Sequence, residues 1–193
     1  MPSPNHSRHQ EKLLCIAQQS SWFMQALRAV RSLKLQSWCI GAGAVRNLVW
    51  DYLHDYDVPS VLADLDVAYF DIAAEVGQNI ELQEILNLME PSVPWEVTNQ
   101  AFVHTWFESY FGYHAQPLYS LEAAVATWPE FATSVGISLS DQDRIEIIAP
   151  HGLEDLFAMR IQRNPARASI ETYRSRVLQK EYARRWPRVS VVP

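Results

Sequence analysis

The sequence is poor in cysteine and has no long apolar run, and each absence excludes a class of protein. Its 193 residues include only two cysteines, Cys15 and Cys39, which are too few for a disulfide framework. Both lie in apolar segments, so we expect buried thiols in a reducing cytoplasm. No apolar run reaches the roughly 18–20 residues that a membrane helix needs, and residues 1–9 lack the apolar segment of a secretory signal.

Basic residues are scarce over the first 150 positions. Residues 1–150 hold 7 Lys and Arg against 18 Asp and Glu, whereas residues 151–193 hold 9 against 4, and the net charge of the whole chain is −6. An acidic total argues against extensive binding of duplex DNA, which usually requires a basic domain. The basic C-terminal part could offer cations to a triphosphate or to nucleic acid, or it could be a solvated helix face.

Apolar periodicity predicts helices interleaved with short strands. Helical spacing predicts helices over 10–33, 44–53, 102–111, 121–128, from 153 onward and 166–185, and a helix within 72–90 that ends near Glu90. Apolar or alternating runs predict strands over 35–40, 61–70 and 95–98, and a hairpin of 134–139 with 144–148. Residues 1–8 are expected to be frayed. We expect one domain over 1–193, with a core of about 10–111 and a C-terminal hairpin and helical part of about 112–193.

The segment 102–111 is rich in aromatic residues. Its large apolar residues recur at helical spacing and are Phe102, Val103, Trp106, Phe107, Tyr110 and Phe111. This spacing favours a helix buried in the core over a surface on which nucleic-acid bases stack.

Two carboxylates, Asp64 and Asp66, alternate in the expected strand 61–70. Alternate residues of a strand share one face, so both side chains point the same way and are close enough to hold one divalent cation. Without a cation or a proton between them, such a pair is costly in repulsion and desolvation. A cationic partner such as Arg46 is the structural alternative to a metal.

A Gly-x-Gly turn, Gly41 to Gly43, precedes this pair in the chain. Glycine lets the backbone turn tightly and approach a ligand closely, and the helix that follows would direct free N–H groups and its positive dipole end to the same place. Arg46 and Asn47 lie near this end, off the apolar stripe; Arg46 could reach a phosphate or simply be solvated. The turn and the carboxylates together suggest a place where a phosphate and a metal meet.

These residues resemble a known family. The order of Gly-x-Gly, helix and Asp-x-Asp is similar to the nucleotidyltransferase superfamily typified by DNA polymerase β, and more closely to a small bacterial family of nucleotidyltransferase-like proteins. The matching blocks are 41–47, 64–71, Asn99-Gln100-Ala101, His104 with Trp106, Trp128-Pro129-Glu130 and 152–156. The spacer between Gly43 and Asp64 is longer than is usual in the wider superfamily.

The resemblance implies a fold, an activity and a site. The fold would be α+β, with a small mixed sheet packed with helices and a C-terminal hairpin and helices. The activity would be transfer of a nucleoside monophosphate from an NTP, with Mg²⁺ or Mn²⁺, to a hydroxyl on RNA, a protein or a small molecule. Asp64, Asp66 and a third acid from a neighbouring strand, Glu96, would be catalytic and hold the metal. Residues of the 41–47 block would bind the phosphates, namely Gly41, Gly43, Arg46 and Asn47.

Two other functions remain open at this point. The chain could be a nucleotide-binding protein that kept the fold and lost turnover, since residue 96 is Glu where many superfamily members have Asp. It could also be a metal-dependent phosphohydrolase, although the His-Asp pairs typical of many such enzymes are scarce. His104 is interpreted as a polar contact near the site rather than as a metal ligand.

Overall fold

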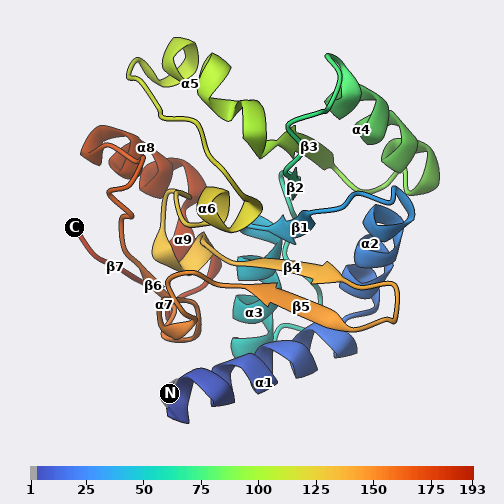
Figure 1. The fold of residues 1–193 in the computed structure, drawn as a ribbon. Coiled ribbons are helices and arrows are strands. Elements are labelled where there is room, and N and C mark those ends of the chain that lie inside the picture. Colours follow the sequence, from blue (N-terminus) through green and yellow to red (C-terminus); the bar gives the residue numbers. More distant parts are fainter. Residues whose placement is uncertain (1–3) are drawn as a thin grey trace.

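The computed structural model describes residues 4–193, with side chains from residue 7 onward. At its centre is a five-stranded sheet in the order β3-β2-β1-β4-β5 (Figure 1). The strands are β1 (Trp38–Gly41), β2 (Leu65–Tyr69), β3 (Trp95–Asn99), β4 (Gly136–Leu139) and β5 (Ile145–Ile148). β2 and β3 are parallel and the other neighbours are antiparallel, so the predicted mixed sheet of an α+β fold is confirmed.

Helices surround this sheet. They are α1 (Pro4–Gln19), α2 (Ser21–Ser32), α3 (Gly43–Leu53), α4 (Gln78–Met89), α5 (Val103–Phe111), α6 (Leu121–Val125), α7 (Glu154–Phe157), α8 (Ile170–Lys180) and α9 (Tyr182–Arg185). Two 3₁₀ turns cover Gln100–Phe102 and Phe131–Thr133, and a small parallel sheet pairs β6 (Arg160–Ile161) with β7 (Ser190–Val191). No helix within residues 4–193 is long and apolar enough to cross a membrane.

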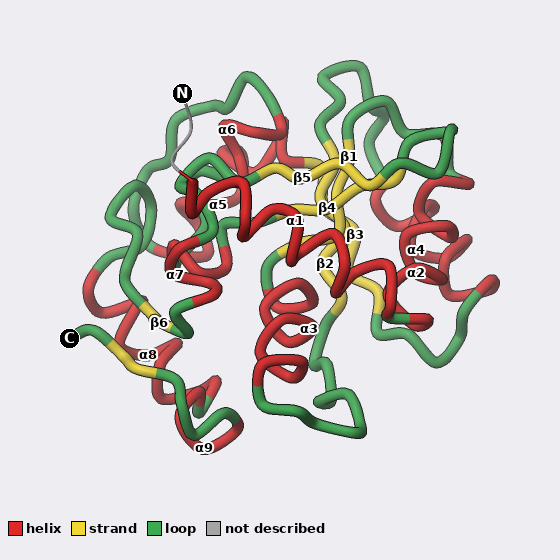
Figure 2. Tube along the Cα trace, turned by 90° about the horizontal axis from the view of Figure 1, so that it is seen from below, coloured by secondary structure: helices red, strands yellow, loops and turns green. Residues whose placement is uncertain are grey.

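The two faces of the sheet are covered differently. One face carries the main apolar core, in which Leu65 and Val67 of β2 pack with residues of α1, α2, α3 and α4. Figure 2 views this side and shows α1 crossing in front of the sheet, with α3 beside it. On the other face, a smaller cluster joins Cys39 and Ala68 to Leu121 and Val125. Asp66 alternates with Val67 and so lies on this second, less covered face.

Three predicted helices differ in extent. The segment 10–33 forms two helices, because Ser20 leaves the helix and its hydroxyl accepts a hydrogen bond from the Phe23 N–H at 3.4 Å as an N-cap. The segment 166–185 divides at Glu181, whose φ of 48° is left-handed. The helix after residue 153 has a single turn, α7. Residues 1–3 of the expected frayed end lie outside the described residues, and the helix already begins at Pro4.

The prediction that 102–111 is a buried helix is only half right. Val103 and Phe107 are buried, but the other aromatic residues of the segment are exposed, namely Phe102, Trp106, Tyr110 and Phe111. Apolar spacing gives the period of a helix but does not show whether a neighbour covers its whole surface.

The prediction of two buried thiols is also half right. Cys39 is fully buried in β1, whereas Cys15 is exposed on α1. The buried side of α1 is taken by Leu13, Ile16 and Ala17, and Cys15 lies on the other side of that helix.

Candidate functional site

The parallel pairing of β2 and β3 brings the three suspected carboxylates together. Asp66 lies opposite Glu96 in the ladder, so their side chains share a face, and Asp64 precedes Asp66 by two residues. Burial, followed by the negative charges of Asp64 and Glu96, raises the pKa of Asp66 to about 7. The carboxylates therefore repel one another, and this repulsion favours the protonated form of Asp66.

The nearest cation to this cluster comes from α8. Lys180 Nζ lies 3.9 Å from Asp64 Oδ2. Carboxylate oxygens are the ligands that Mg²⁺ prefers, so the chemistry of Asp64, Asp66 and Glu96 suits a hard divalent ion. Within the described residues, however, no three His, Cys, Asp or Glu side chains are arranged so that they could hold a metal ion. Metal binding would thus require these side chains to turn toward one another and the Lys180 ammonium to move away from Asp64.

The glycines of the Gly41–Gly43 turn have different surroundings. A Cβ on Gly41 would lie 2.4 Å from the Trp128 ring and 2.9 Å from the Val135 carbonyl oxygen, so this glycine is needed for packing. A Cβ on Gly43 would meet only Arg46 Nη2 at 3.6 Å and Asp64 Oδ1 at 3.8 Å. Gly43 therefore leaves a small space beside Asp64 at the first residue of α3.

The residue between them, Ala42, has an unusual backbone. Its φ of 50° and ψ of −116° lie outside the regions that an L residue normally adopts. Its carbonyl oxygen accepts the Arg46 N–H at 3.1 Å, and its own N–H donates to the Val135 carbonyl at 3.3 Å. Strain of this kind is found where surrounding structure fixes a ligand-binding turn.

Arg46 is buried in α3, so the alternative of a solvated side chain is wrong. Only 4% of it is exposed, and its guanidinium lies 5.1–5.7 Å from the ring centroids of Trp50, Tyr182 and Trp186. Nη2 donates to Asn47 Oδ1 at 2.7 Å, but Nε is buried without a hydrogen-bond partner. Burial lowers the pKa of Arg46. A buried guanidinium with an unused donor is poised to receive an anion.

A cavity of about 260 Å³ lies between the turn and Asp64. Its lining residues come from α3, the segment before β2, and the end of α8 with α9, and they are Gly43, Arg46, Asn47, Leu62, Ala63, Asp64, Gln179, Lys180, Glu181 and Arg185. Of the predicted phosphate ligands, Gly43, Arg46 and Asn47 line this cavity, whereas Gly41 lies under Trp128. Three cations and two acids, Asp64 and Glu181, thus surround a space next to the carboxylate cluster.

Sequence reasoning missed the group that places α8 here. Glu130 is fully buried, and its carboxylate accepts Arg176 Nε at 2.8 Å and the Thr133 hydroxyl at 2.8 Å. Tyr182, which also packs on Arg46, donates to Glu130 at 3.4 Å. The family resemblance includes the block Trp128-Pro129-Glu130 but implies no role for it. Its signal was a lone acid between apolar residues, which must be paired if it is buried.

Another matching block has a structural explanation. The Asn99 side chain accepts the N–H groups of Ala101 and Asp71, each at 3.1 Å, and donates to the Asp71 carbonyl at 2.7 Å. It therefore links the ends of β2 and β3 and caps the 3₁₀ turn that leads to α5.

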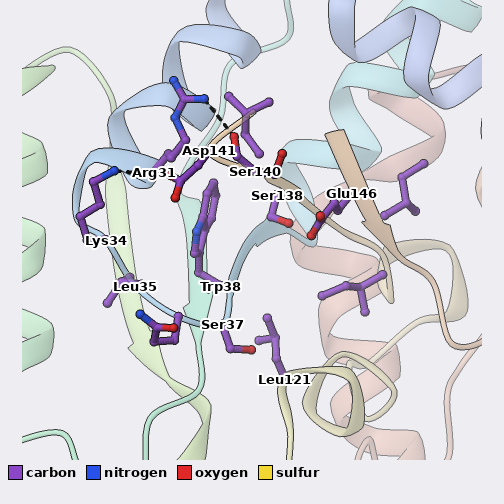
Figure 3. A pocket seen from close by; sticks show the side chains of 14 residues that line it. Arg31, Lys34, Leu35, Ser37, Trp38, Leu121, Ser138, Ser140, Asp141 and Glu146 are labelled. Carbon is purple, nitrogen blue, oxygen red and sulfur yellow. Dashed lines mark hydrogen bonds and ion pairs between the residues drawn. The ribbon is translucent and has the colours of Figure 1, made fainter. Parts of the chain in front are cut away.

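A separate hollow of about 460 Å³ lies over β1, β4 and β5 (Figure 3). Both of its cations are paired: Lys34 with Asp141 of the same lining at 3.4 Å, and Arg31 with Asp143, just outside it, at 2.6 Å. None of Asp64, Asp66 and Glu96 lines this hollow. We therefore place the candidate site at the smaller cavity beside α3.

Solved structures share this fold. One, described as "The NMR structure of the protein reveals a CCA-adding enzyme head domain", matches with a TM-score of 0.81 and 26% identity over 94% of this chain and 95% of that chain. Two structures of a tRNA-processing enzyme, apo form 2 and complex 3, match with TM-scores of 0.51 and 0.50 at 16% and 17% identity over 86% of this chain. This chain spans only 44% and 42% of their lengths, so this second likeness concerns the fold alone.

The sequence itself gives the family. A search of curated proteins finds no match. A family model described as "Nucleotidyltransferase" matches residues 28–191, which include the turn, the carboxylates and α8. The chain therefore belongs to this nucleotidyltransferase family.

Proposed function

We propose that the chain is a metal-dependent nucleotidyltransferase that transfers a nucleoside monophosphate from an NTP to a hydroxyl group. The observation that carries this proposal is the pairing of Asp66 with Glu96 beside Asp64, next to a cavity lined by Arg46, whose Nε has no partner. The buried carboxylate of Asp66 and the unpaired buried donor of Arg46 are both costly unless a ligand compensates them. We propose further that residues 1–193 act as one domain, because β4 and β5 join the same sheet as β1.

The reaction divides the site into two parts. The acceptor hydroxyl oxygen forms a bond to the α-phosphorus of the NTP while the bond from that phosphorus to the leaving pyrophosphate breaks, and the hydroxyl proton is released. Asp64, Asp66 and Glu96 would hold Mg²⁺ or Mn²⁺, which supplies a more acidic acceptor hydroxyl and neutralises charge on the phosphates.

The cavity side of the site would bind the triphosphate. Gly43 leaves room for a phosphate at the first turn of α3, where N–H groups and the helix dipole favour an anion. Arg46 would donate its unused Nε–H, held in place by Asn47 and three aromatic rings. Lys180, released from Asp64 when a metal neutralises that carboxylate, would turn to the phosphates.

The acceptor is proposed from chemistry and from the fold's relatives. Solved relatives of this fold include a CCA-adding enzyme head domain and a tRNA-processing enzyme, so an RNA 3′ hydroxyl is the first acceptor to test. A protein or a small molecule would be tested in the same assay.

Labelled nucleotides test the proposal directly. The protein is incubated with each α-³²P-NTP, with Mg²⁺ or Mn²⁺ and with total RNA or a cell lysate, and we expect a labelled product that the double variant Asp64→Asn, Asp66→Asn does not form. The variant Asp55→Asn, Asp57→Asn removes two exposed loop acids and is the matched control. Equal activity in the Asp64, Asp66 variant would overturn the proposal, and label lost only to water would indicate a phosphohydrolase.

A nucleotide-binding protein without turnover is the second candidate. It is favoured by the contact of Lys180 with Asp64, which already supplies a cation to the acid cluster. Such a protein would bind NTP in calorimetry without transferring label, and Lys180→Gln would leave it inactive. In the enzyme, the same substitution lowers NTP affinity while label transfer persists.

A further inference from the structure

Three exposed aromatic side chains lie at the start of α5 and along it. Phe102, Trp106 and Tyr110 are 38%, 43% and 78% exposed. Phe102 ends the 3₁₀ turn that leads into α5, whereas Trp106 and Tyr110 lie within α5. Their spacing of four residues places Trp106 and Tyr110 on one side of the helix, and their rings meet edge to face at 6.3 Å. We call these three residues the aromatic ridge. Single aromatic residues are common on protein surfaces, but a row of three along one helix needs a reason.

Beside the ridge, α5 packs through Phe107 against Tyr113 and Arg167, which we call the base of the ridge. Phe107 is buried, meets Tyr113 edge to face at 5.3 Å, and lies 5.3 Å from the guanidinium of Arg167. The Tyr113 hydroxyl donates to the Arg167 carbonyl, and Arg167 Nη2 donates to the Gln116 carbonyl at 2.6 Å. These contacts join α5 to the segment before α8, so Arg167 borders the helix that carries the ridge.

A groove of about 480 Å³ borders the same base. Its lining consists of 113–118, Thr127, Arg163 and 165–169. Two arginines and His114 are among these residues, and no lining residue is an aspartate or a glutamate. One acid, Glu108 of α5, lies beside the groove and pairs with His114 at 3.3 Å. The two arginines belong to the basic C-terminal part of the chain and make the groove complementary to a polyanion.

The ridge is also close to the candidate site along the chain. β3 carries Glu96 near its start and leads directly into the 3₁₀ turn Gln100–Phe102 and then α5. Three strand residues and one 3₁₀ turn span about 16 Å. A strand of nucleic acid lying along the ridge could therefore bring its end to the carboxylates.

We propose that the aromatic ridge and this groove bind the single-stranded end of a nucleic-acid acceptor. Bases stack on Phe102, Trp106 and Tyr110, and phosphates lie along the groove at Arg163 and Arg167. Exposed aromatics beside cations are the combination that holds unpaired bases without a fixed sequence. That the bound nucleic acid is an acceptor rests on the proposed nucleotidyl transfer, but the binding itself can be measured without any transfer.

Binding of a fluorescein-labelled single-stranded RNA of about 12 nucleotides, followed by fluorescence anisotropy, tests the proposal. The variant Trp106→Ala, Tyr110→Ala should raise the Kd at least about 10-fold, since each stacked base contributes about 1–3 kcal/mol. Tyr119→Ala removes a tyrosine that is 86% exposed outside the ridge and is the matched control, with Kd unchanged. Trp106→Phe, Tyr110→Phe keeps the rings and should keep most of the affinity.

Two further measurements separate this inference from the proposed function. NTP affinity should be the same in the Trp106→Ala, Tyr110→Ala variant as in the wild type, and the Asp64→Asn, Asp66→Asn variant should bind the RNA normally even though it transfers nothing. A matching DNA strand and a duplex RNA are the comparison ligands, and the duplex should bind more weakly. Unchanged RNA affinity in the alanine variant overturns the inference. So does a wild-type dimer in sedimentation that the alanine variant disrupts without a change in RNA affinity, because the ridge is then a contact between two copies.

Discussion

Glu130 and Arg176 form an ion pair that holds α8 against the body of the protein. The Glu130 carboxylate is fully buried, and Arg176 donates to it through Nε at 2.8 Å and Nη2 at 3.3 Å. Burial lowers the pKa of Arg176, but the charge and hydrogen bonds of Glu130 raise it well above its ordinary value. Because Lys180 lies on the same helix, one turn further along, this pair also sets where the cation beside Asp64 stands.

Substitution of Glu130 should therefore lower the stability of the protein. Glu130→Gln leaves the Arg176 charge without its partner, and we expect the free energy of unfolding to fall by about 3 kcal/mol, as when one member of a buried ion pair is removed. Urea unfolding measures this. Glu181→Gln removes the exposed pair with Arg184 and should cost at most about 1 kcal/mol. Equal losses in the two variants would contradict the role given to Glu130.

The pH dependence of stability should reveal Asp66. Its pKa is about 7 in the folded protein, because of burial first and then the charges of Asp64 and Glu96, against an ordinary value of 3.8. Between these values the folded state binds more protons than the unfolded state, so the free energy of unfolding should fall as pH rises from about 4 to about 7. Asp66→Asn should lose this dependence and be the more stable protein above pH 7 without metal.

Thermal unfolding over a pH series measures this difference. Each kcal/mol shifts the melting temperature by about 2–4 °C in a chain of this size, and the variant should gain over the wild type only as pH rises through this window. Asp141→Asn, at an exposed turn, is the control and should follow the wild type. A melting temperature of Asp66→Asn that stays below that of the wild type at pH 8 would show that the carboxylates do not repel one another.

The sequence allowed prediction of the parts of the site that depend on local pattern. Asp64 and Asp66 were identified because acids within an apolar strand are hard to explain otherwise, and the pairing of Asp66 with Glu96 now shows that these acids share a face. Local pattern did not reveal how α3 meets the C-terminal helices. Burial of Arg46 among Trp50, Tyr182 and Trp186 depends on residues about 140 positions apart, and no periodicity reports such contacts.

The aromatic segment 102–111 also shows that local sequence pattern does not reveal contacts between elements. The spacing of the apolar residues predicted the helix correctly, but the prediction of burial was wrong for Phe102, Trp106 and Tyr110. Whether an apolar stripe is covered depends on a neighbouring element, and on α5 only Val103 and Phe107 are covered. The segment 102–111 has more large aromatic residues than one side of a short helix can bury. This excess is the feature of the sequence that indicates exposed aromatic side chains.

The unused donor of Arg46 leads to a prediction about nucleotide binding. Arg46→Lys keeps the charge but loses the planar guanidinium and its Nε–H, so NTP affinity should fall at least about 10-fold, as expected for a lost hydrogen bond between charged groups. Isothermal titration calorimetry with a non-hydrolysable NTP analogue measures this loss of affinity. Arg28→Lys alters an exposed residue of α2 and should leave the affinity unchanged. Equal affinities in the wild type and Arg46→Lys would remove Arg46 from the phosphate site.

The two glycines of the turn should behave in opposite ways when each becomes alanine. At Gly41 a Cβ meets the Trp128 ring at 2.4 Å and the Val135 carbonyl oxygen at 2.9 Å, so Gly41→Ala should destabilise the fold by about 1–3 kcal/mol through overpacking.

At Gly43 the nearest atoms are 3.6 and 3.8 Å away and the backbone is helical, so Gly43→Ala should leave stability unchanged or raise it by up to about 1 kcal/mol. The same methyl fills the space beside Asp64 that we assign to a phosphate, so Gly43→Ala should bind NTP markedly more weakly. Urea unfolding and calorimetry on the two variants test both statements, and normal NTP affinity in a stable Gly43→Ala protein would show that the phosphates lie elsewhere.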